Sequence, residues 1–129
     1  MKLATALKLG RVSNLPTVWS NVLAGMVLAG GPAAVTAESG VTLALVLVAV
    51  TSLYVAGMFL NDAFDAGWDR ENRLERPIPS GAATRREVFL WGGALLAAGP
   101  PLLLSIGAPV AAGGLALAAR RWSATASRR

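Results

Sequence analysis

The sequence predicts an all-α protein, a bundle of helices that cross a membrane several times. Hydrophobic residues make up 54% of the 129 residues and charged residues only 15%, a balance typical of membrane proteins. The charged residues are also confined to short segments, which leaves long uncharged stretches between them. Several of these stretches are long enough to cross about 30 Å of hydrocarbon at about 1.5 Å per residue.

Composition also limits the chemistry that this chain can perform. It has no cysteine and no histidine, which excludes a disulfide framework, a thiol nucleophile and zinc bound by cysteine. Any reaction must rely on carboxylates, arginine, lysine, tyrosine or hydroxyl groups. The formal net charge is +5, but the basic residues all lie outside the long apolar stretches, as is usual beside a membrane. Nucleic acid is therefore not an expected partner.

The first predicted span is the uncharged stretch from Val12 to Ala37. Pro16 lies near its start, where proline is tolerated, and Gly30-Gly31-Pro32 is a typical helix break. Asn21 interrupts the apolar surface of this span. Its amide could bind substrate in a cavity, or it could bond to a neighbouring helix, as polar residues in spans do.

The second predicted span, Val41 to Leu60, is uncharged and continues as a helix into the stretch Asn61 to Asp69, which reads NDAFDAGWD. Five arginines lie between Asn61 and Glu87, whereas Gly31 to Gly40 contains no lysine or arginine. Positively charged loops stay in the cytoplasm. We therefore expect the N-terminus and the acidic stretch on the cytoplasmic side, with the Gly31 to Gly40 segment outside.

Two further spans are expected after the acidic stretch. The segment Arg76 to Gly81 (RPIPSG) cannot be helical, because each proline disfavours helix at the residue before it. Thr84 to Glu87 (TRRE) matches a capping box, which would start a third span from about Thr84 to Ile106. A short fourth span begins near Ala108, and residues 120–129 form a basic tail that we expect to be disordered.

The candidate site is a stripe of three carboxylates, Asp62, Asp65 and Asp69, at spacing i, i+3 and i+7. At about 100° per residue they lie on one face of a helix, with Asn61 level with Asp65 at i+4. Like charges repel one another, so this clustering predicts a bound cation. Carboxylate oxygens suit a hard ion such as Mg²⁺, which proteins hold together with substrate phosphates.

A purely structural interpretation stays open beside this one. The carboxylates could pair with Arg70, Arg73 and Arg76, and Asp69 and Arg73 have the i, i+4 spacing of a helical ion pair. The arginines could instead bind a diphosphate, because guanidinium matches phosphate geometry with paired hydrogen bonds. Their presence could also reflect only the positive charge of a cytoplasmic loop.

These motifs resemble the UbiA superfamily of intramembrane prenyltransferases. The resemblance rests on Asn61-Asp62-x-x-Asp65-x-x-x-Asp69, on the segment Arg76 to Gly81, and on the start of the first span, Arg11 to Trp19 (RVSNLPTVW). It covers residues 1–119, which we expect to form the N-terminal part of a UbiA-like membrane domain with about four spans.

The resemblance implies a helical bundle around a cavity that opens to lipid. In such a bundle Mg²⁺ and Asp-rich motifs hold a prenyl diphosphate at the cytoplasmic side, and a lipophilic or aromatic acceptor takes the isoprenyl group. We expect an integral protein of a bacterial plasma membrane. The expected catalytic and metal-binding residues are Asp62, Asp65 and Asp69, and the expected substrate-binding residues are Asn61, Asn21, Arg73 and Arg76.

One departure from the family pattern bears on activity. The family has a second Asp-rich motif, whereas this chain has no aspartate after Asp69. We therefore expect a truncated member that a second chain could complete. The alternative is a small membrane protein without catalytic activity, either a remnant or an assembly partner.

Overall fold

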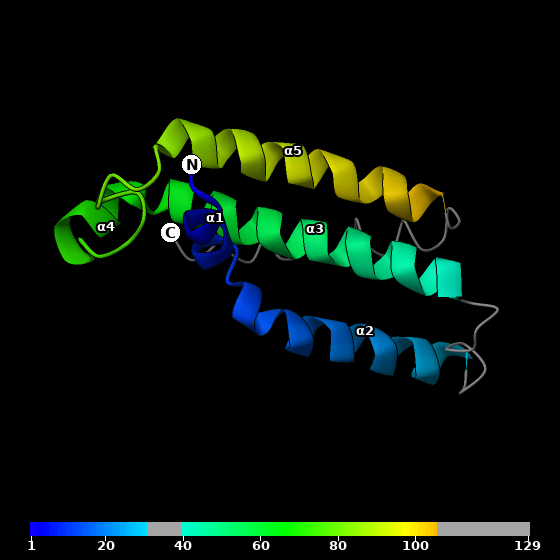
Figure 1. Ribbon diagram of the computed structural model, residues 1–129. Helices are drawn as coiled ribbons and strands as arrows, with labels where there is room; N and C mark the ends of the chain where they lie inside the picture. The colour runs from blue at the N-terminus through cyan, green and yellow to red at the C-terminus, as the bar shows by residue number, and fades with distance from the viewer. Residues whose placement is uncertain (31–39, 106–129) are drawn as a thin grey trace, which may run out of the picture.

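The computed structural model describes residues 1–30 and 40–105, and within these ranges every regular element is a helix. This confirms the all-α class. Figure 1 shows α3 and α5 side by side, α2 along another side of α3, and α1 and α4 near the same end of the bundle. The elements are α1 (Leu3–Leu9), the short 3-10 helix η1 (Val12–Asn14), α2 (Leu15–Gly30), α3 (Gly40–Phe64), α4 (Ala66–Asn72) and α5 (Arg85–Leu104).

Two of the described helices, α3 and α5, are long and apolar enough to cross a membrane. They contain 25 and 20 residues, which is about 37 Å and about 30 Å of helix at 1.5 Å per residue. These helices match the predicted second and third spans.

The predicted first span, Val12 to Ala37, begins later than expected. Residues Val12–Asn14 form η1, and the α-helix α2 starts only at Leu15 and has 16 residues. Residues 31–37 of this span lie outside the described residues, as do the predicted fourth span and the predicted tail at 120–129.

Small residues let α3 and α5 approach closely. Ala49 and Ala56 of α3 are fully buried, and Gly92 and Gly99 of α5 are buried as well. A Cβ atom added at Gly99 would lie only 2.6 Å from the side chain of Leu53. Inside a bilayer, such close contact between small residues is a main source of helix association, because lipid removes most of the hydrophobic driving force.

The start of α5 has the predicted capping box. The Thr84 hydroxyl accepts a hydrogen bond from the backbone N–H of Glu87 at 3.2 Å, and the Glu87 carboxylate accepts one from the backbone N–H of Thr84 at 3.0 Å. These bonds satisfy two of the N–H groups that a helix start leaves unpaired.

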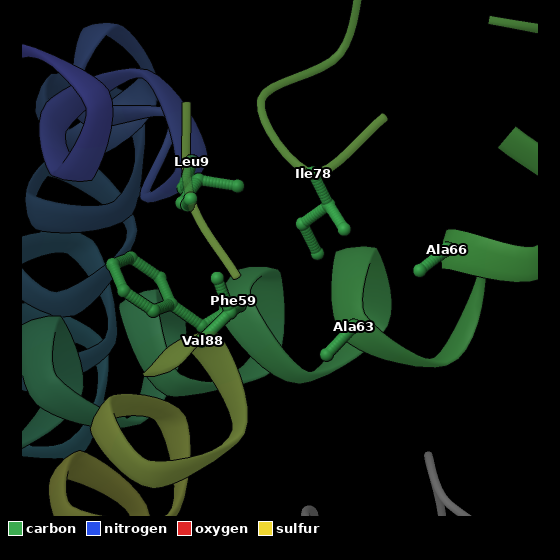
Figure 2. Close-up of a cluster of buried hydrophobic side chains, with 7 residues drawn as sticks. Leu9, Phe59, Ala63, Ala66, Ile78 and Val88 are labelled. Atoms are coloured by element: carbon green, nitrogen blue, oxygen red, sulfur yellow. The ribbon is translucent and has the colours of Figure 1, made fainter. Parts of the chain in front are cut away.

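A core of buried apolar side chains joins the elements at the α4 end of the bundle. Figure 2 shows most of its members, which come from α1, α3, α4, the segment between α4 and α5, and α5: Leu9, Phe59, Ala63, Ala66, Ile78, Ala83 and Val88. As predicted, the segment Arg76 to Gly81 is not helical. Because Ile78 belongs to the core, this segment is held against the junction of α3 and α4.

Candidate functional site

The three aspartates of the predicted stripe lie at the junction of α3 and α4. A single continuous helix was expected here, but α3 ends at Phe64 and α4 begins at Ala66. Asp65 lies between them with φ −78° and ψ −3°. The interruption is small, because the N–H of Asp65 still bonds to Asn61 and that of Asp69 to Asp65, both at 2.9 Å.

Arg76 joins two of these aspartates. Its Nη1 donates to Asp62 Oδ1 at 2.8 Å and to Asp69 Oδ2 at 3.2 Å. Asp62 is 7% exposed and Asp69 only 2%, so both charges are largely withdrawn from water. A buried carboxylate is costly unless a cation or hydrogen-bond donors compensate it. The guanidinium provides that compensation, and we call this trio the Arg76 bridge.

A second arginine reaches the same aspartate from the N-terminal segment. Arg11 Nη2 lies 3.7 Å from Asp62 Oδ1. Arg11 has φ 46° and ψ 47°, a left-handed conformation that is uncommon for a residue other than glycine. Sequence reasoning did not include Arg11 among the site residues, because its partner is 51 positions away. Its one signal was its place at the start of the motif RVSNLPTVW.

Asp65 contacts Asn61, one turn earlier on α3. Its Oδ2 accepts a hydrogen bond from Asn61 Nδ2 at 3.1 Å, as their i, i+4 spacing predicts. The structure therefore brings Asp62 and Asp69 together and gives Asp65 a different neighbour. That Asp62, Asp65 and Asp69 act together as one metal-binding stripe stays a prediction.

The structural alternative allowed an ion pair between Arg73 and Asp69, and none is found between them. Helix α4 ends at Asn72, and Arg73 has φ −146° and ψ 68°, although its backbone N–H still donates to the Asp69 carbonyl at 2.7 Å. Its guanidinium instead lies 5.1 Å from the ring centroid of Trp68, a distance suited to a cation–π contact. Asp69 pairs with Arg76 in its place.

Asn21, the remaining predicted site residue, is exposed on α2. Two positions before it, the indole N–H of Trp19 donates to the Thr51 hydroxyl at 2.9 Å. Thr51 precedes Asp62 by 11 residues on α3, which is roughly 16 Å along a helix. Asn21 therefore lies close to the level of Thr51, and so at a distance from the aspartates along the bundle.

The chemistry of the donor set fits part of a divalent-cation site. Asp62 and Asp69 both contact one nitrogen atom of Arg76, so the two carboxylates already share one positively charged group. Their oxygens are the hard ligands that Mg²⁺ prefers. Within residues 1–30 and 40–105, no three acidic, histidine or cysteine side chains are gathered closely enough to hold a metal ion.

Comparison with known proteins assigns the chain to a family. The family model described as the UbiA prenyltransferase family matches residues 8–120. The chain is 37% identical over 106 residues to digeranylgeranylglyceryl phosphate synthase of Ignicoccus hospitalis, covering 82% of this chain and 33% of that protein. It is 36% identical over 95 residues to the protein of the same name from Methanothrix thermoacetophila, covering 74% and 34%.

A shorter match reaches 46% identity over 56 residues with the synthase of Methanoregula boonei, covering 43% of this chain and 20% of that protein. The chain thus spans about a third of the length of the first two relatives. No solved structure matches it. The family match extends from the end of α1 through α5, so it includes the Asp62–Asp69 junction and the Arg76 segment. The chain therefore belongs to the UbiA prenyltransferase family.

Proposed function

We propose that this chain contributes to a membrane prenyltransferase that moves an isoprenyl group from a prenyl diphosphate to a lipophilic acceptor. The observation that carries the proposal is the Arg76 bridge, two buried carboxylates held together at one end of the apolar helices α3 and α5. Acidic groups at such a position are expensive and are usually retained for a functional site.

Each site residue has a role in this proposal. Asp62, Asp65 and Asp69 bind Mg²⁺, which when bound supplies positive charge to the departing diphosphate. Asn61 orients Asp65 through the 3.1 Å hydrogen bond. The aspartates lie where the apolar helix α3 ends and α4 begins. A prenyl chain that lies among the apolar helices would place its diphosphate at this end.

The arginines bind the diphosphate in this proposal. Arg76 uses Nη1 for both of its ion pairs with the described residues, which leaves Nη2 and Nε to donate to phosphate oxygens. Arg73 is exposed on the same segment and is steadied by Trp68. Guanidinium groups suit this task because they stay charged and present several donors in one plane. Asn21 is too remote for the diphosphate and would instead contact the prenyl chain or acceptor.

The acceptor is proposed from similarity. The relatives described above are named for the synthesis of digeranylgeranylglyceryl phosphate. Their name favours a lipophilic acceptor that carries a phosphate over an aromatic acceptor. We also propose that the N-terminus and the α3–α4 junction lie on the cytoplasmic side, as the distribution of arginine indicates. A second chain that completes the bundle remains a prediction.

The test is binding of radiolabelled geranylgeranyl diphosphate to the purified chain in detergent, with Mg²⁺ or with a chelator. We expect binding that requires Mg²⁺ and that weakens about tenfold or more in Asp62→Asn and Asp65→Asn, because each loses a charged ligand. Glu75→Gln removes an exposed acidic residue of the neighbouring segment and should bind like the wild type. Binding that ignores Mg²⁺ or both aspartates would contradict the proposal. No binding at all would favour the non-catalytic alternative.

A further inference from the structure

The arginine that begins α5 reaches back to the end of α3. Arg85 Nε donates a hydrogen bond to the Ala63 carbonyl at 2.8 Å, although the two residues are 22 positions apart. Ala63 is fully buried and directly follows Asp62. The bond therefore ties the start of α5 to the backbone of α3, beside one carboxylate of the Arg76 bridge.

The Ala63 carbonyl needs such a donor because the helix is interrupted just after it. In a continuous helix this carbonyl would accept the N–H of the residue four positions later, but α3 ends at the next residue. Of the described residues, Asp65 and Asp69 donate the backbone hydrogen bonds that bridge the interruption, and both bonds go to other carbonyls. A buried carbonyl without a partner destabilises the fold. The bond from Arg85 supplies the partner that the interruption removes.

Helix electrostatics favour this contact at the end of α3. The last carbonyls of a helix carry partial negative charge, and its first N–H groups carry partial positive charge. Arg85 is the first residue of α5, where a cation is disfavoured, yet its side chain bonds to the C-terminal end of α3, where a cation is favoured. The stability of α5 alone therefore gives no reason for an arginine at this position, whereas the end of α3 does.

A pair of aromatic rings steadies the guanidinium. Arg85 Cζ lies 5.4 Å from the centroid of the Phe89 ring, one turn later on α5, a distance suited to a cation–π contact. Phe89 in turn meets Phe64, the last residue of α3, with ring centroids 4.9 Å apart and an interplanar angle of 89°. The first turns of α5 thus contact both of the last two residues of α3, one through its carbonyl and the other through its ring.

The interruption lies between the two aspartates of the Arg76 bridge. Asp62 is on α3 and Asp69 is on α4, and Nη1 of Arg76 contacts them at 2.8 and 3.2 Å. The separation of the two carboxylates therefore depends on the direction in which α4 leaves α3. A contact that fixes the end of α3 at the interruption also fixes that direction.

We propose that Arg85 is a positioning residue for the acidic site. By holding the end of α3 against the start of α5, it sets the direction of α4 and keeps Asp69 close to Asp62. The ion pairs of these two aspartates within the described residues are with Arg11 and Arg76, so Arg85 acts on them through the backbone. Its effect on metal binding rests on the proposed function, whereas its effect on the α3–α4 geometry does not.

The first measurement is the distance between α4 and α5 in the full chain, held in lipid nanodiscs. Because the sequence contains no cysteine, spin labels can be attached at Glu71→Cys on α4 and Leu96→Cys on α5, both exposed positions, and read by pulsed electron paramagnetic resonance. We expect a narrow distance distribution in the labelled chain and a broader or shifted one when Arg85→Gln is added. Arg86→Gln removes the same charge from the next residue, which is exposed, and should leave the distribution unchanged.

Arg85→Lys tests the hydrogen bond itself. Its ammonium can still donate to the Ala63 carbonyl, so the distance distribution should be narrower than in Arg85→Gln. Three results would overturn the proposal: a distribution in Arg85→Gln that matches the unsubstituted chain, equal broadening in Arg86→Gln, or no recovery in Arg85→Lys.

Mn²⁺ affinity of the same variants tests whether this geometry serves the aspartates. Replacing a residue that orients metal ligands from outside typically weakens metal binding by about 10–100-fold. We expect about tenfold weaker Mn²⁺ binding by Arg85→Gln and wild-type binding by Arg86→Gln, with the same helix content of both by circular dichroism. Wild-type affinity in Arg85→Gln, despite a broadened distance distribution, would overturn the positioning role. If the wild type itself binds no Mn²⁺, the proposed function fails, and the spin-label distances alone decide whether Arg85 fixes the junction.

Discussion

The ion pairs between aspartates and arginines differ in length and in burial. Arg76 contacts two largely buried carboxylates at 2.8 and 3.2 Å, whereas Arg11 reaches one of them at 3.7 Å and remains more exposed. Because Asp69 is only 2% exposed, water can do little to stabilise its charge if the arginine is removed. Arg76 therefore supplies the positive charge that compensates these two buried carboxylates.

Replacing Arg76 by glutamine tests this role. We expect Arg76→Gln to lower the free energy of unfolding by about 3–5 kcal/mol, because it leaves two carboxylates buried together without their cation. Arg70→Gln, an exposed arginine of α4, should change it by less than about 0.5 kcal/mol. Thermal unfolding in detergent, followed by circular dichroism, measures both.

Adding Mg²⁺ to the unfolding measurement tests whether a metal ion can replace the charge of Arg76. If the carboxylates also bind Mg²⁺, millimolar Mg²⁺ should restore part of the stability that Arg76→Gln loses, because the ion binds the folded state only. Equal stability of the two variants would show that Arg76 does not compensate the buried charges.

Among the helices, the contact between α3 and α5 is the most extensive. It depends on residues without large side chains, since Gly92 and Gly99 lie against Leu60 and Leu53 of α3. The α3–α4 junction and the segment that carries Arg76 are attached to this pair through the core around Phe59 and Ile78. The spacing of the two long helices thus affects the geometry of the site at their end.

Alanine substitutions at two glycines of α5 distinguish the effect of close helix packing on stability from the effect of helix propensity. In Gly99→Ala the new Cβ would lie 2.6 Å from Leu53, so α3 and α5 must move apart, and we expect a loss of about 1–3 kcal/mol. In Gly93→Ala the Cβ meets nothing within 4 Å, and the higher helix propensity of alanine should leave stability unchanged or raise it by up to about 1 kcal/mol. Thermal unfolding of the two variants compares them, and a Gly99→Ala protein as stable as Gly93→Ala would refute this account of the contact.

As a whole, the molecule is an integral membrane protein of the UbiA family, with two helices in its described part that can cross the bilayer. Its acidic junction, its N-terminal turn and its arginine-rich segment all lie at one end of these helices (Figure 1). This arrangement puts every group proposed to bind a phosphate on one side of the membrane.

Local patterns predicted much of this structure. The long uncharged stretches of the sequence predicted α3 and α5. The TRRE motif predicted where α5 starts, and the prolines predicted the non-helical segment before it. The Asp motif could be assigned to a family because its spacing is short and lies within one continuous stretch.

Contacts between distant segments could not be predicted in the same way. The structural interpretation named Arg70, Arg73 and Arg76 as partners of the carboxylates, and of these three Arg76 pairs with Asp62 and Asp69. Helical spacing alone singled out Arg73 for Asp69, whereas Arg76 lies on a segment anchored through Ile78. The approach of Arg11 to Asp62 depends on a left-handed turn in the backbone. Neither the end of α4 nor that turn has a sequence signal as strong as a proline or a capping box.

The most direct test of the central claim, that Asp62 and Asp69 can hold a divalent cation, is a titration of the chain in lipid nanodiscs with Mn²⁺, read by electron paramagnetic resonance. Mn²⁺ accepts the same oxygen ligands as Mg²⁺. We predict that the wild type binds Mn²⁺, that Mg²⁺ displaces it, and that Asp69→Asn binds about tenfold more weakly or worse. Glu71→Gln, an exposed acidic residue of the same helix, should bind like the wild type. If Asp69→Asn binds Mn²⁺ as the wild type does, or if the wild type binds none, the two aspartates serve only as the structural partners of Arg76.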